Sequence, residues 1–380
     1  MPNFKISCPP FVIFALFFHR GVTNPNQATM EEVHEVVIVG AGVSGLATAL
    51  GLHRKGIRTL VLESSDSLRA AGFALLTWSN AWKALDALGV GDLLRQTHVP
   101  LQRLVIHSAI SGAVSQRQQF WDGRQRMQHE VRAVRRNQLL EALAKELPPN
   151  TIRFSSKVVS IEEEGRLKLL HLADGSTLKT KALVGSDGVN SVVAKWLGFR
   201  NASFSGRWAC RGLAGFSKDY ILKHQFIQYF FGNGFRAGIM PCDEKTVYWF
   251  FTWTPTDQEK EAEEDTVKIR ELILARLKNS KVPKDVIEAI EGSDMGAMIP
   301  APLKFRMPLH LLRWNICKDN VCVTGDALHP MTPDLGQGGC SALEDAVVLV
   351  RCLAERWLVL EVPEGEAAVW DYVQDSAKVC

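Results

Sequence analysis

The 380-residue sequence has no C-x-x-C pair among its eight cysteines, no long basic run and no repeated or low-complexity block. Scattered cysteines favour neither a disulfide framework nor a zinc site, so we expect a reducing compartment and no metal. A net charge of only +3 gives no reason to expect nucleic acid as a partner. The composition, 46% apolar and 22% charged, is that of a soluble globular protein with room for two or three domains or one composite domain.

The first 29 residues lack Asp and Glu, as organellar transit peptides do. Their apolar run, Phe11–Phe18, is too short to span a bilayer but suits the core of a signal peptide. Three interpretations stay open for residues 1–29: an upstream extension with Met30 as the working start, a targeting segment, or an ordered part of the fold. We expect a cytoplasmic protein without a stable membrane span, or a plastid protein if residues 1–29 are a transit segment.

The stretch Val36–Gly45 reads V-V-I-V-G-A-G-V-S-G and predicts a buried parallel strand that turns into a helix. Gly40 would permit the tight turn, Gly42 the approach of a pyrophosphate, and Gly45 the close packing of helix on sheet. Exposed N–H groups and the helix dipole suit phosphate at such a turn. This pattern, in its strand and helix context, predicts a dinucleotide site.

Three acidic residues follow predicted strands. Glu63 ends the strand Arg58–Leu62, about 20 residues beyond the glycines, where a carboxylate can accept the hydroxyls of an adenosine ribose. Asp187 follows the strand that ends at Gly185, in the run V-G-S-D-G-V-N-S, which then opens a helix. Asp326 ends the strand in N-V-C-V-T-G-D, where it can accept hydrogen bonds from ribityl hydroxyls. These positions predict one ligand site at the carboxyl edge of a doubly wound sheet.

Two further segments suit a ligand. The glycine loop Gly336–Gly339 precedes a helix, so its N–H groups can point at an anionic edge. Arg136 lies at the start of a helix whose apolar stripe is formed by Leu139, Leu140, Leu143 and Leu147. An arginine there can reach a phosphate or a ribityl chain, and a surface salt bridge is the alternative.

Residues 200–310 predict strands rich in Phe and Trp, at Gln228–Phe231, Gly234–Pro241 and Thr246–Thr254. In the last strand one face carries Val247, Trp249, Phe251 and Trp253. Packing in a core is the favoured interpretation of such a face, and a substrate cavity is the alternative.

Together, G-A-G-V-S-G, V-G-S-D-G-V-N-S and V-T-G-D-A-L-H-P-M-T-P-D-L-G-Q-G-G-C-S-A-L-E-D-A resemble the three fingerprints of class A flavoprotein monooxygenases. The match is especially close to plant FAD-dependent monooxygenases related to 3-hydroxybenzoate 6-hydroxylase, salicylate hydroxylase and zeaxanthin epoxidase. The order and spacing of the fingerprints match over residues 33–352, most of the chain. Cys340 is a departure, because many family members carry Asn there.

The resemblance implies an α/β fold: a Rossmann-like FAD-binding domain of the glutathione-reductase type with an inserted α+β substrate domain on a mixed or antiparallel sheet. We expect the FAD-binding domain at residues 30–199, with short substrate-side insertions near 70–130, and at 311–355. The substrate-binding sheet would occupy 200–310. Residues 356–380 would form a C-terminal tail shorter than is usual for the family, after an extension or targeting segment at 1–29.

The resemblance also implies roles for single residues. Asp187 would serve both FAD and NAD(P)H, Asp326 would hold the ribityl chain, and Pro330–Gly339 would lie along the isoalloxazine ring. His329 is interpreted as structural, and no catalytic acid or base is named. The expected cofactor-binding residues are Gly40, Gly42, Val43, Ser44, Gly45, Glu63, Ser64, Arg69, Arg136, Asp187, Gly188, Asp326, Pro333, Gly336, Gln337, Gly338 and Gly339.

In the family, NAD(P)H reduces the flavin, O₂ adds as a C4a-hydroperoxide, and the distal oxygen passes to the substrate. The resemblance therefore implies an FAD-dependent monooxygenase that uses NADPH or NADH and O₂ to hydroxylate or epoxidise a small aromatic or unsaturated compound. Two alternatives stay open: a flavin-dependent reductase or dehydrogenase of the geranylgeranyl-reductase type, and a degenerate FAD-binding protein with an interaction role. The sequence does not distinguish a monomer from a dimer.

Overall fold

The computed structural model describes residues 33–68, 73–120, 129–257, 259, 265–293, 298, 300–308 and 316–359. All of them belong to the unit Val33–Cys380. The expectations for residues 1–29, for Arg69 and for the end of the chain beyond residue 359 lie outside the described residues.

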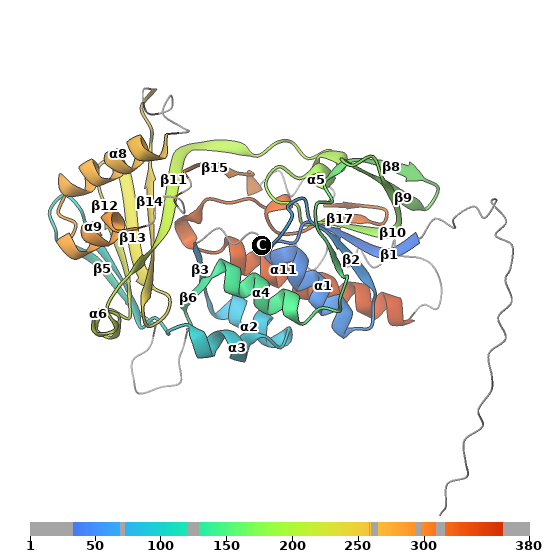
Figure 1. Ribbon diagram of the computed structural model, residues 1–380, viewed down its shortest axis with the longest axis horizontal. Coiled ribbons are helices and arrows are strands. Elements are labelled where there is room, and N and C mark those ends of the chain that lie inside the picture. Colours follow the sequence, from blue (N-terminus) through green and yellow to red (C-terminus); the bar gives the residue numbers. More distant parts are fainter. Residues whose placement is uncertain are drawn as a thin grey trace, which may run out of the picture. The chain divides into compact units, whose positions relative to one another are not determined.

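The larger sheet has eight strands and is parallel at its centre (Figure 1). Its strands are β1 (Val33–Val39), β2 (Thr59–Leu62), β7 (Ile152–Arg153), β8 (Val158–Glu164), β9 (Leu167–Leu172), β10 (Thr177–Gly185), β16 (Cys317–Lys318) and β17 (Val321–Val323). The order is β16–β17–β10–β1–β2–β7, and β9 pairs with both β10 and β8. Because β1, β10 and β17 are parallel neighbours, their carboxyl ends bring the three glycine-rich fingerprints to one edge of the sheet.

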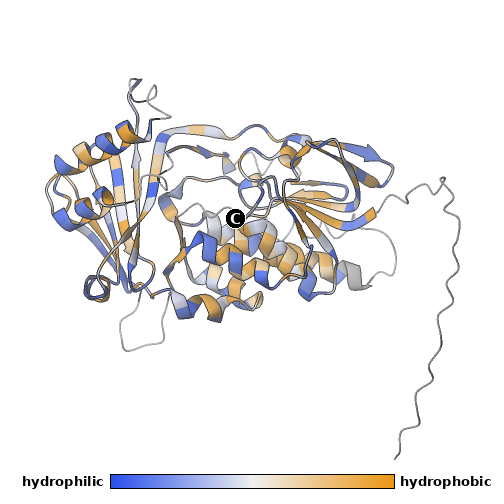
Figure 2. Ribbon diagram, in the orientation of Figure 1, coloured by the Kyte–Doolittle hydropathy of each residue, from blue (hydrophilic) through white to orange (hydrophobic). Residues whose placement is uncertain are grey.

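Helices cover this sheet, and the first of them packs on the last. They are α1 (Val43–Arg54), α2 (Ser79–Ala87), α3 (Gly91–Thr97), α4 (Arg136–Lys145), α5 (Val192–Trp196) and α11 (Gly338–Val359). Helices α1 and α11 meet at Gly51, where an added Cβ would lie 2.6 Å from Cγ2 of Val350. Leu46, Leu50 and Leu343 are fully buried in the core between these layers. Figure 2 shows the central strands as predominantly hydrophobic, as expected for a sheet buried on both faces.

The second sheet has seven strands in the order β15–β11–β14–β13–β12–β4–β5. They are β4 (Arg103–Ser108), β5 (Val114–Gln119), β11 (Ser203–Gly215), β12 (Ile227–Phe231), β13 (Phe235–Pro241), β14 (Thr246–Trp253) and β15 (Ala301–Phe305). β4 and β12 pair in parallel, whereas the other pairs are antiparallel. Two strands of this sheet therefore come from residues 103–119, well before the segment 200–310 that supplies the rest.

One face of the second sheet is a core of its own. It is covered by α8 (Thr266–Lys278) and α9 (Lys284–Glu291), while α6 (Lys218–Lys223) links β11 to β12. Trp249 and Phe251 are fully buried on this face, together with Ile273 of α8. The aromatic face of β14 therefore packs in a core, which is the favoured interpretation. The opposite face of the sheet is the one that faces the glycine turn.

A two-stranded sheet, β3 (Ala74–Thr77) with β6 (Arg132–Arg135), and two short 3₁₀ helices, η2 (Gly325–Ala327) and η3 (Pro333–Leu335), complete the described elements. Strands β7 and β8 are separate, and Ser155 adopts a positive φ of 51° between them. Strand β10 is long enough to pair first with β9 and then with β1.

Candidate active site

Two adjoining cavities follow the carboxyl edge of the larger sheet. The first, of about 250 Å³, runs from the glycine turn past Glu63 and Ser64 to Asp187. The second, of about 330 Å³, extends from the same turn to the second sheet. Both cavities are lined by Gly42, Arg136, Ser186 and Gly188. Since binding cavities for small molecules and cofactors typically measure about 300–1,000 Å³, the two together suit an elongated ligand.

The glycine turn has the shape that a pyrophosphate requires. A Cβ on Gly40 would lie 2.5 Å from the carbonyl oxygen of Ser186, and one on Gly45 would lie 2.0 Å from that of Gly40. A Cβ on Gly42, by contrast, would meet no atom within 4 Å, so this glycine faces open space. Gly42 is the N-cap of α1, and no side chain caps that helix. An FAD pyrophosphate therefore fits against Gly42 and the N-terminus of α1.

Glu63 lies directly after β2 and is 8% exposed. The N–H of Ala41 donates to its Oε2 at 2.8 Å, and the N–H of Ser65 donates to its Oε1 at 2.9 Å. These bonds fix the carboxylate beside the glycine turn, where it lines the first cavity with Ser64. The hydroxyl of Ser64 also donates to Oε1, at 3.2 Å, so several donors orient the carboxylate at the edge of this cavity.

Asp187 has a structural task that its motif did not reveal. Its Oδ2 accepts the N–H of Val192 at 2.7 Å, and its Oδ1 accepts the hydroxyl of Ser191. Both oxygens thus bind the start of α5, although the residue also lines the first cavity. Burial raises the pKa of Asp187, while these hydrogen bonds lower it and only partly offset burial.

A buried hydroxyl cluster joins the three fingerprints. The Oγ of Ser44 donates to Oγ1 of Thr324 at 2.7 Å, and the hydroxyls of Ser186 and Thr324 lie 2.9 Å apart. Thr324 is fully buried. The sequence singles out Ser44 but not Ser186 or Thr324, because a hydroxyl beside an acidic residue carries no pattern of its own. The cluster holds the turns that follow β1, β10 and β17 in one arrangement.

The third acidic residue, Asp326, follows a strand as predicted. It lies in η2, directly after β17, and opens into the second cavity. The surrounding protein nevertheless raises the pKa of its carboxyl by desolvation, against the positive charges of His329, Arg211 and Arg136. Arg136 is the first residue of α4, as predicted, and its guanidinium lies over the ring of Phe73 at 5.8 Å.

His329 is held by the last helix. Its Nε2 lies 2.7 Å from Oδ2 of Asp345, which also accepts the N–H of Gly325 at 2.7 Å. Burial lowers the pKa of His329, but its hydrogen bond with Asp345 and the charge of Asp345 outweigh burial and raise it overall. This pair fixes the turn that carries Asp326, which is consistent with a structural histidine.

The loop from Met331 to Gly339 forms one wall of the second cavity. Pro333, Gly336, Gly338 and Gly339 line it, and Gly336 has a left-handed φ of 63°. Gln337 accepts a hydrogen bond from Nδ2 of Asn80, a residue of α2. The thiol of Cys340 donates to the carbonyl of Leu76 at 3.4 Å, so this small residue ties the start of α11 to β3.

Asp334 anchors the same loop to the second sheet. Arg207 of β11 approaches both of its carboxylate oxygens, at 3.0 and 3.2 Å, and Arg236 of β13 also binds it. The loop Met331–Gly339 is therefore attached to β11 and β13 on the opposite side of the cavity.

The far end of the second cavity is built by the second sheet. Its lining includes Arg211, Tyr229, Met240, Tyr248 and Phe250, none of which the sequence analysis singled out. These residues lie on the face opposite the Trp249 core, and strand register alone decides which face each takes.

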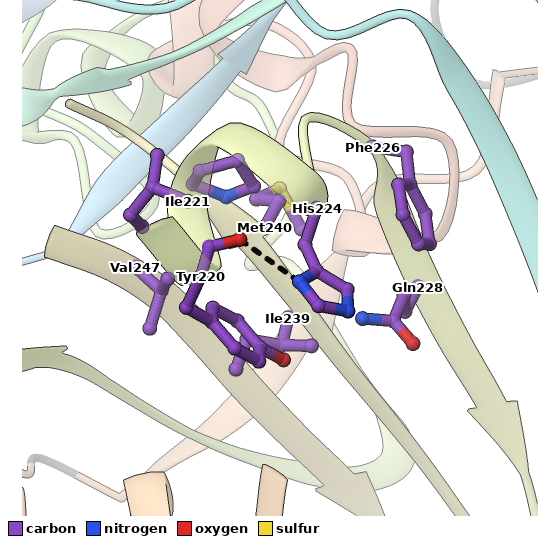
Figure 3. Close-up of a pocket in the computed structure, with 9 residues that line it drawn as sticks. Tyr220, Ile221, His224, Phe226, Gln228, Ile239, Met240 and Val247 are labelled. Carbon is purple, nitrogen blue, oxygen red and sulfur yellow. Dashed lines mark hydrogen bonds between the residues drawn. The ribbon is translucent and has the colours of Figure 1, made fainter. Parts of the chain in front are cut away.

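A third, much smaller cavity lies beside α6, lined by Tyr220, His224 and Gln228 among others (Figure 3). The Nδ1 of His224 lies 2.8 Å from the carbonyl oxygen of Tyr220 there. The volume of this third cavity, about 10 Å³, gives room for about one water molecule, so the cavity cannot hold a substrate.

The fold and the groove together define an FAD-binding α/β protein with a second sheet at the far end of the groove. Residues 33–358 match the family model described as FAD binding domain. Monooxygenase 2 of Arabidopsis thaliana is 49% identical over 348 residues, which cover 90% of this chain and 84% of that protein. Monooxygenase 1 of the same organism is 37% identical over 335 residues, covering 86% and 80%. The crystal structure of Klebsiella pneumoniae HpxO complexed with FAD and uric acid is similar with a TM-score of 0.75 at 25% identity, covering 91% of this chain and 87% of that one.

This chain belongs to the family of FAD-dependent monooxygenases that share this FAD-binding domain. The family and the fold class predicted from the three fingerprints are confirmed. Within the described part of the chain, no helix has the length and unbroken apolar character needed to cross a bilayer.

Proposed function

We propose that the protein uses NADPH or NADH and O₂ to hydroxylate or epoxidise a small aromatic or unsaturated compound. One observation carries the proposal: the second cavity is continuous from the glycine turn to a wall of aromatic side chains on the second sheet. A cofactor anchored at the turn would thus present its reactive end to a substrate held against that wall. The similar HpxO structure, which holds FAD and uric acid, supports this arrangement.

The residues at the first cavity would bind the ADP half of FAD. Gly42 and the N-terminus of α1 leave space and a favourable dipole for the pyrophosphate, and Glu63 would accept the ribose hydroxyls. Arg136 lines both cavities, so it would contact the middle of the cofactor. Asp187 would act on both FAD and NAD(P)H chiefly by holding the turn beside α5, where its carboxylate is bonded.

The residues at the second cavity would orient the flavin. Asp326 would accept hydrogen bonds from the ribityl hydroxyls, and the N–H groups at Gly338 and Gly339 would face the anionic edge of the reduced ring. Bound FAD supplies the transfer of electrons from NAD(P)H and the activation of O₂. Phe250, Met240 and Leu76 supply an apolar lining that excludes water from the reacting atoms.

We also propose different binding roles for the two sheets. The segments near 30–199 and 311–355 would bind FAD. The second sheet, built from 200–310 together with β4 and β5, would bind the substrate.

The test uses the purified full-length chain. We expect a yellow protein that releases FAD on denaturation and oxidises NADPH or NADH faster when a substrate is present. With ¹⁸O₂, one labelled oxygen should enter the product, after correction of the NAD(P)H balance for peroxide. A protein without FAD, or substrate turnover without oxygen-18 in the product, would refute the proposal, and the second outcome would favour a reductase.

A further inference from the structure

We propose that Arg306 is a positioning residue for FAD: it holds the backbone of the turn that carries Asp326, and so fixes the direction in which that carboxylate meets the cofactor. The inference rests on the proposed function, because the role of Asp326 toward FAD belongs to that proposal. Arg306 does not occur among the described residues that line the two large cavities, so it would act through the turn and not by touching the cofactor.

Arg306 connects the two sheets. It directly follows β15, at the edge of the second sheet, whereas the turn follows β17 of the larger sheet. Its Nη1 donates to the carbonyl oxygen of Ala327 at 2.7 Å and also to that of Leu328. Its backbone N–H donates to the carbonyl oxygen of Pro330 at 2.9 Å. One residue of the second sheet therefore binds the carbonyl side of the turn at successive positions.

The other sides of the turn are held by the FAD-binding part of the chain. The carboxylate of Asp345, on α11, accepts the N–H of Gly325 at 2.7 Å. Gly325 has a left-handed φ of 58°, and a Cβ there would lie 2.9 Å from the Cβ of Ser44, so the turn packs directly on the start of α1. With Arg306 on the carbonyl side and Asp345 on the amide side, the side chain of Asp326 is left to line the second cavity.

An arginine suits this task. The guanidinium is planar, stays charged and presents its donors in a fixed fork, so one group can bind several carbonyls in set directions. The Nη2 of Arg306 reaches the carbonyl oxygen of Arg200 at 3.4 Å, and the guanidinium lies 4.9 Å from the ring centre of Phe199. Burial lowers the pKa of Arg306, and no carboxylate forms an ion pair with it among the residues that the structure describes. Carbonyl groups are therefore what satisfies this partly buried cation, through charge-assisted hydrogen bonds.

The direction of Asp326 depends on these bonds because the turn is short. Its 3₁₀ helix, Gly325–Ala327, has three residues, and a single turn of this kind has few hydrogen bonds of its own. Ala327 and Leu328 are buried, so loss of the guanidinium would leave their carbonyls without this donor and free the turn to rotate. Hydrogen bonds tolerate displacements of only a few tenths of an ångström, so a rotated Asp326 would lose its bonds to the ribityl hydroxyls.

The test is a double-mutant cycle on FAD affinity with the FAD-loaded full-length protein. The protein is diluted, and the free FAD is separated by ultrafiltration and measured by its fluorescence, which gives the dissociation constant. We expect Arg306→Met to weaken FAD binding about tenfold, and Arg306→Lys, which keeps the charge and a donor, to weaken it less. With Asp326→Ala already present, Arg306→Met should change the affinity by less than about twofold, because the carboxylate that Arg306 positions is absent.

A purely structural role would give a different pattern. Without FAD, Arg306→Met should lower the midpoint of urea unfolding equally with and without Asp326→Ala, whereas its effect on FAD affinity should require Asp326. Arg306→Gln is measured in parallel, because its amide can still donate to one carbonyl and it serves as the test variant if Arg306→Met does not fold. Arg103→Met is the matched control. Arg103 of β4, in the same sheet, lies over the ring of Phe226 at 4.3 Å, away from this turn, so the variant should keep the FAD affinity of the wild type.

Two results would overturn the inference: an unchanged FAD affinity in the Arg306 variants that fold, or an equal loss of affinity with and without Asp326. An unchanged affinity in Asp326→Ala alone would refute both this inference and the role of Asp326. The proposed reaction has its own tests, FAD content and oxygen-18 incorporation, so failure of the positioning role leaves it standing.

Discussion

Replacing Gly42 by alanine tests the cofactor site without disturbing the fold. Gly42 has φ −79° and ψ −173°, which alanine adopts without strain, and the added Cβ would meet no protein atom within 4 Å. Alanine restricts the unfolded chain, which stabilises the protein by about 0.4–1 kcal/mol, but it is a poorer N-cap by about 1 kcal/mol. We therefore expect the FAD-free variant to unfold within about 1 kcal/mol of the wild type.

The added methyl group would occupy the space where the pyrophosphate approaches. Its effect should therefore appear when FAD is added. At an FAD concentration 100 times the dissociation constant, binding stabilises the wild type by about 2.7 kcal/mol. A hundredfold loss of affinity would reduce this to about 0.4 kcal/mol at the same concentration. With about 2 °C per kcal/mol for a large domain, FAD should raise the unfolding midpoint by about 5 °C in the wild type and about 1 °C in the variant.

The assay is a thermal melt of each protein with and without FAD. Gly215→Ala is the matched control, since a Cβ there also meets no atom within 4 Å but lies at the end of β11, away from the glycine turn. Gly45→Ala gives the contrasting result: its Cβ would overlap the carbonyl oxygen of Gly40, so the FAD-free protein itself should lose about 3 kcal/mol or more. An FAD-induced shift in Gly42→Ala equal to that of the wild type would refute the assignment of this turn to the pyrophosphate.

Four other substitutions follow from the site. Asp326→Ala should weaken FAD retention more than Asp187→Ala; equal FAD content in the wild type and Asp326→Ala, measured by absorbance, would count against this. Asp187→Ala should lower stability by about 1 kcal/mol, because it removes the hydrogen bonds from Val192 and Ser191 at the start of α5, and should mainly impair reduction by NAD(P)H. Thr324→Val should cost about 1–3 kcal/mol in chemical unfolding, because it leaves the hydroxyls of Ser44 and Ser186 without this partner, and an unchanged unfolding midpoint would contradict the role of the cluster. Asp345→Asn should destabilise the protein most at low pH. The folded pKa of His329 is raised above 6.5, so the His329–Asp345 pair contributes its full stability below about pH 6.5 and less as the pH rises through the folded pKa. Thermal melts between pH 6 and 9 should show the wild type and Asp345→Asn converging as the pH rises, and a constant difference would rule the pair out.

The sequence was sufficient to place the glycine turn and the acidic residues that line the groove. Gly40, Gly42, Glu63 and Asp326 belong to local patterns, in which a strand, a turn and a helix follow one another within a few residues. Such patterns fix where each side chain lies relative to the sheet edge. The order of the three fingerprints then fixed the family.

The far end of the second cavity, at the second sheet, could not be predicted in this way. Arg211, Tyr229 and Phe250 come from three strands, and their meeting depends on pairing register over long sequence separations. The positive φ of Ser155 and the hydrogen bond from Val192 to Asp187 also leave no trace in the periodicity of the sequence. Arg136 was predictable because helix spacing alone places it at the start of α4.

The packing of α1 against α11 has a consequence for synthesis of the chain. The glycine turn and α1 leave the ribosome early, whereas their partners β17 and α11 are about 300 residues further on. At about 5–20 residues per second, the apolar side of α1 that receives Val350 waits about 15–60 s for its partner. A nascent chain therefore exposes the apolar side of α1 until α11 has been made, and during this interval that surface is open to aggregation.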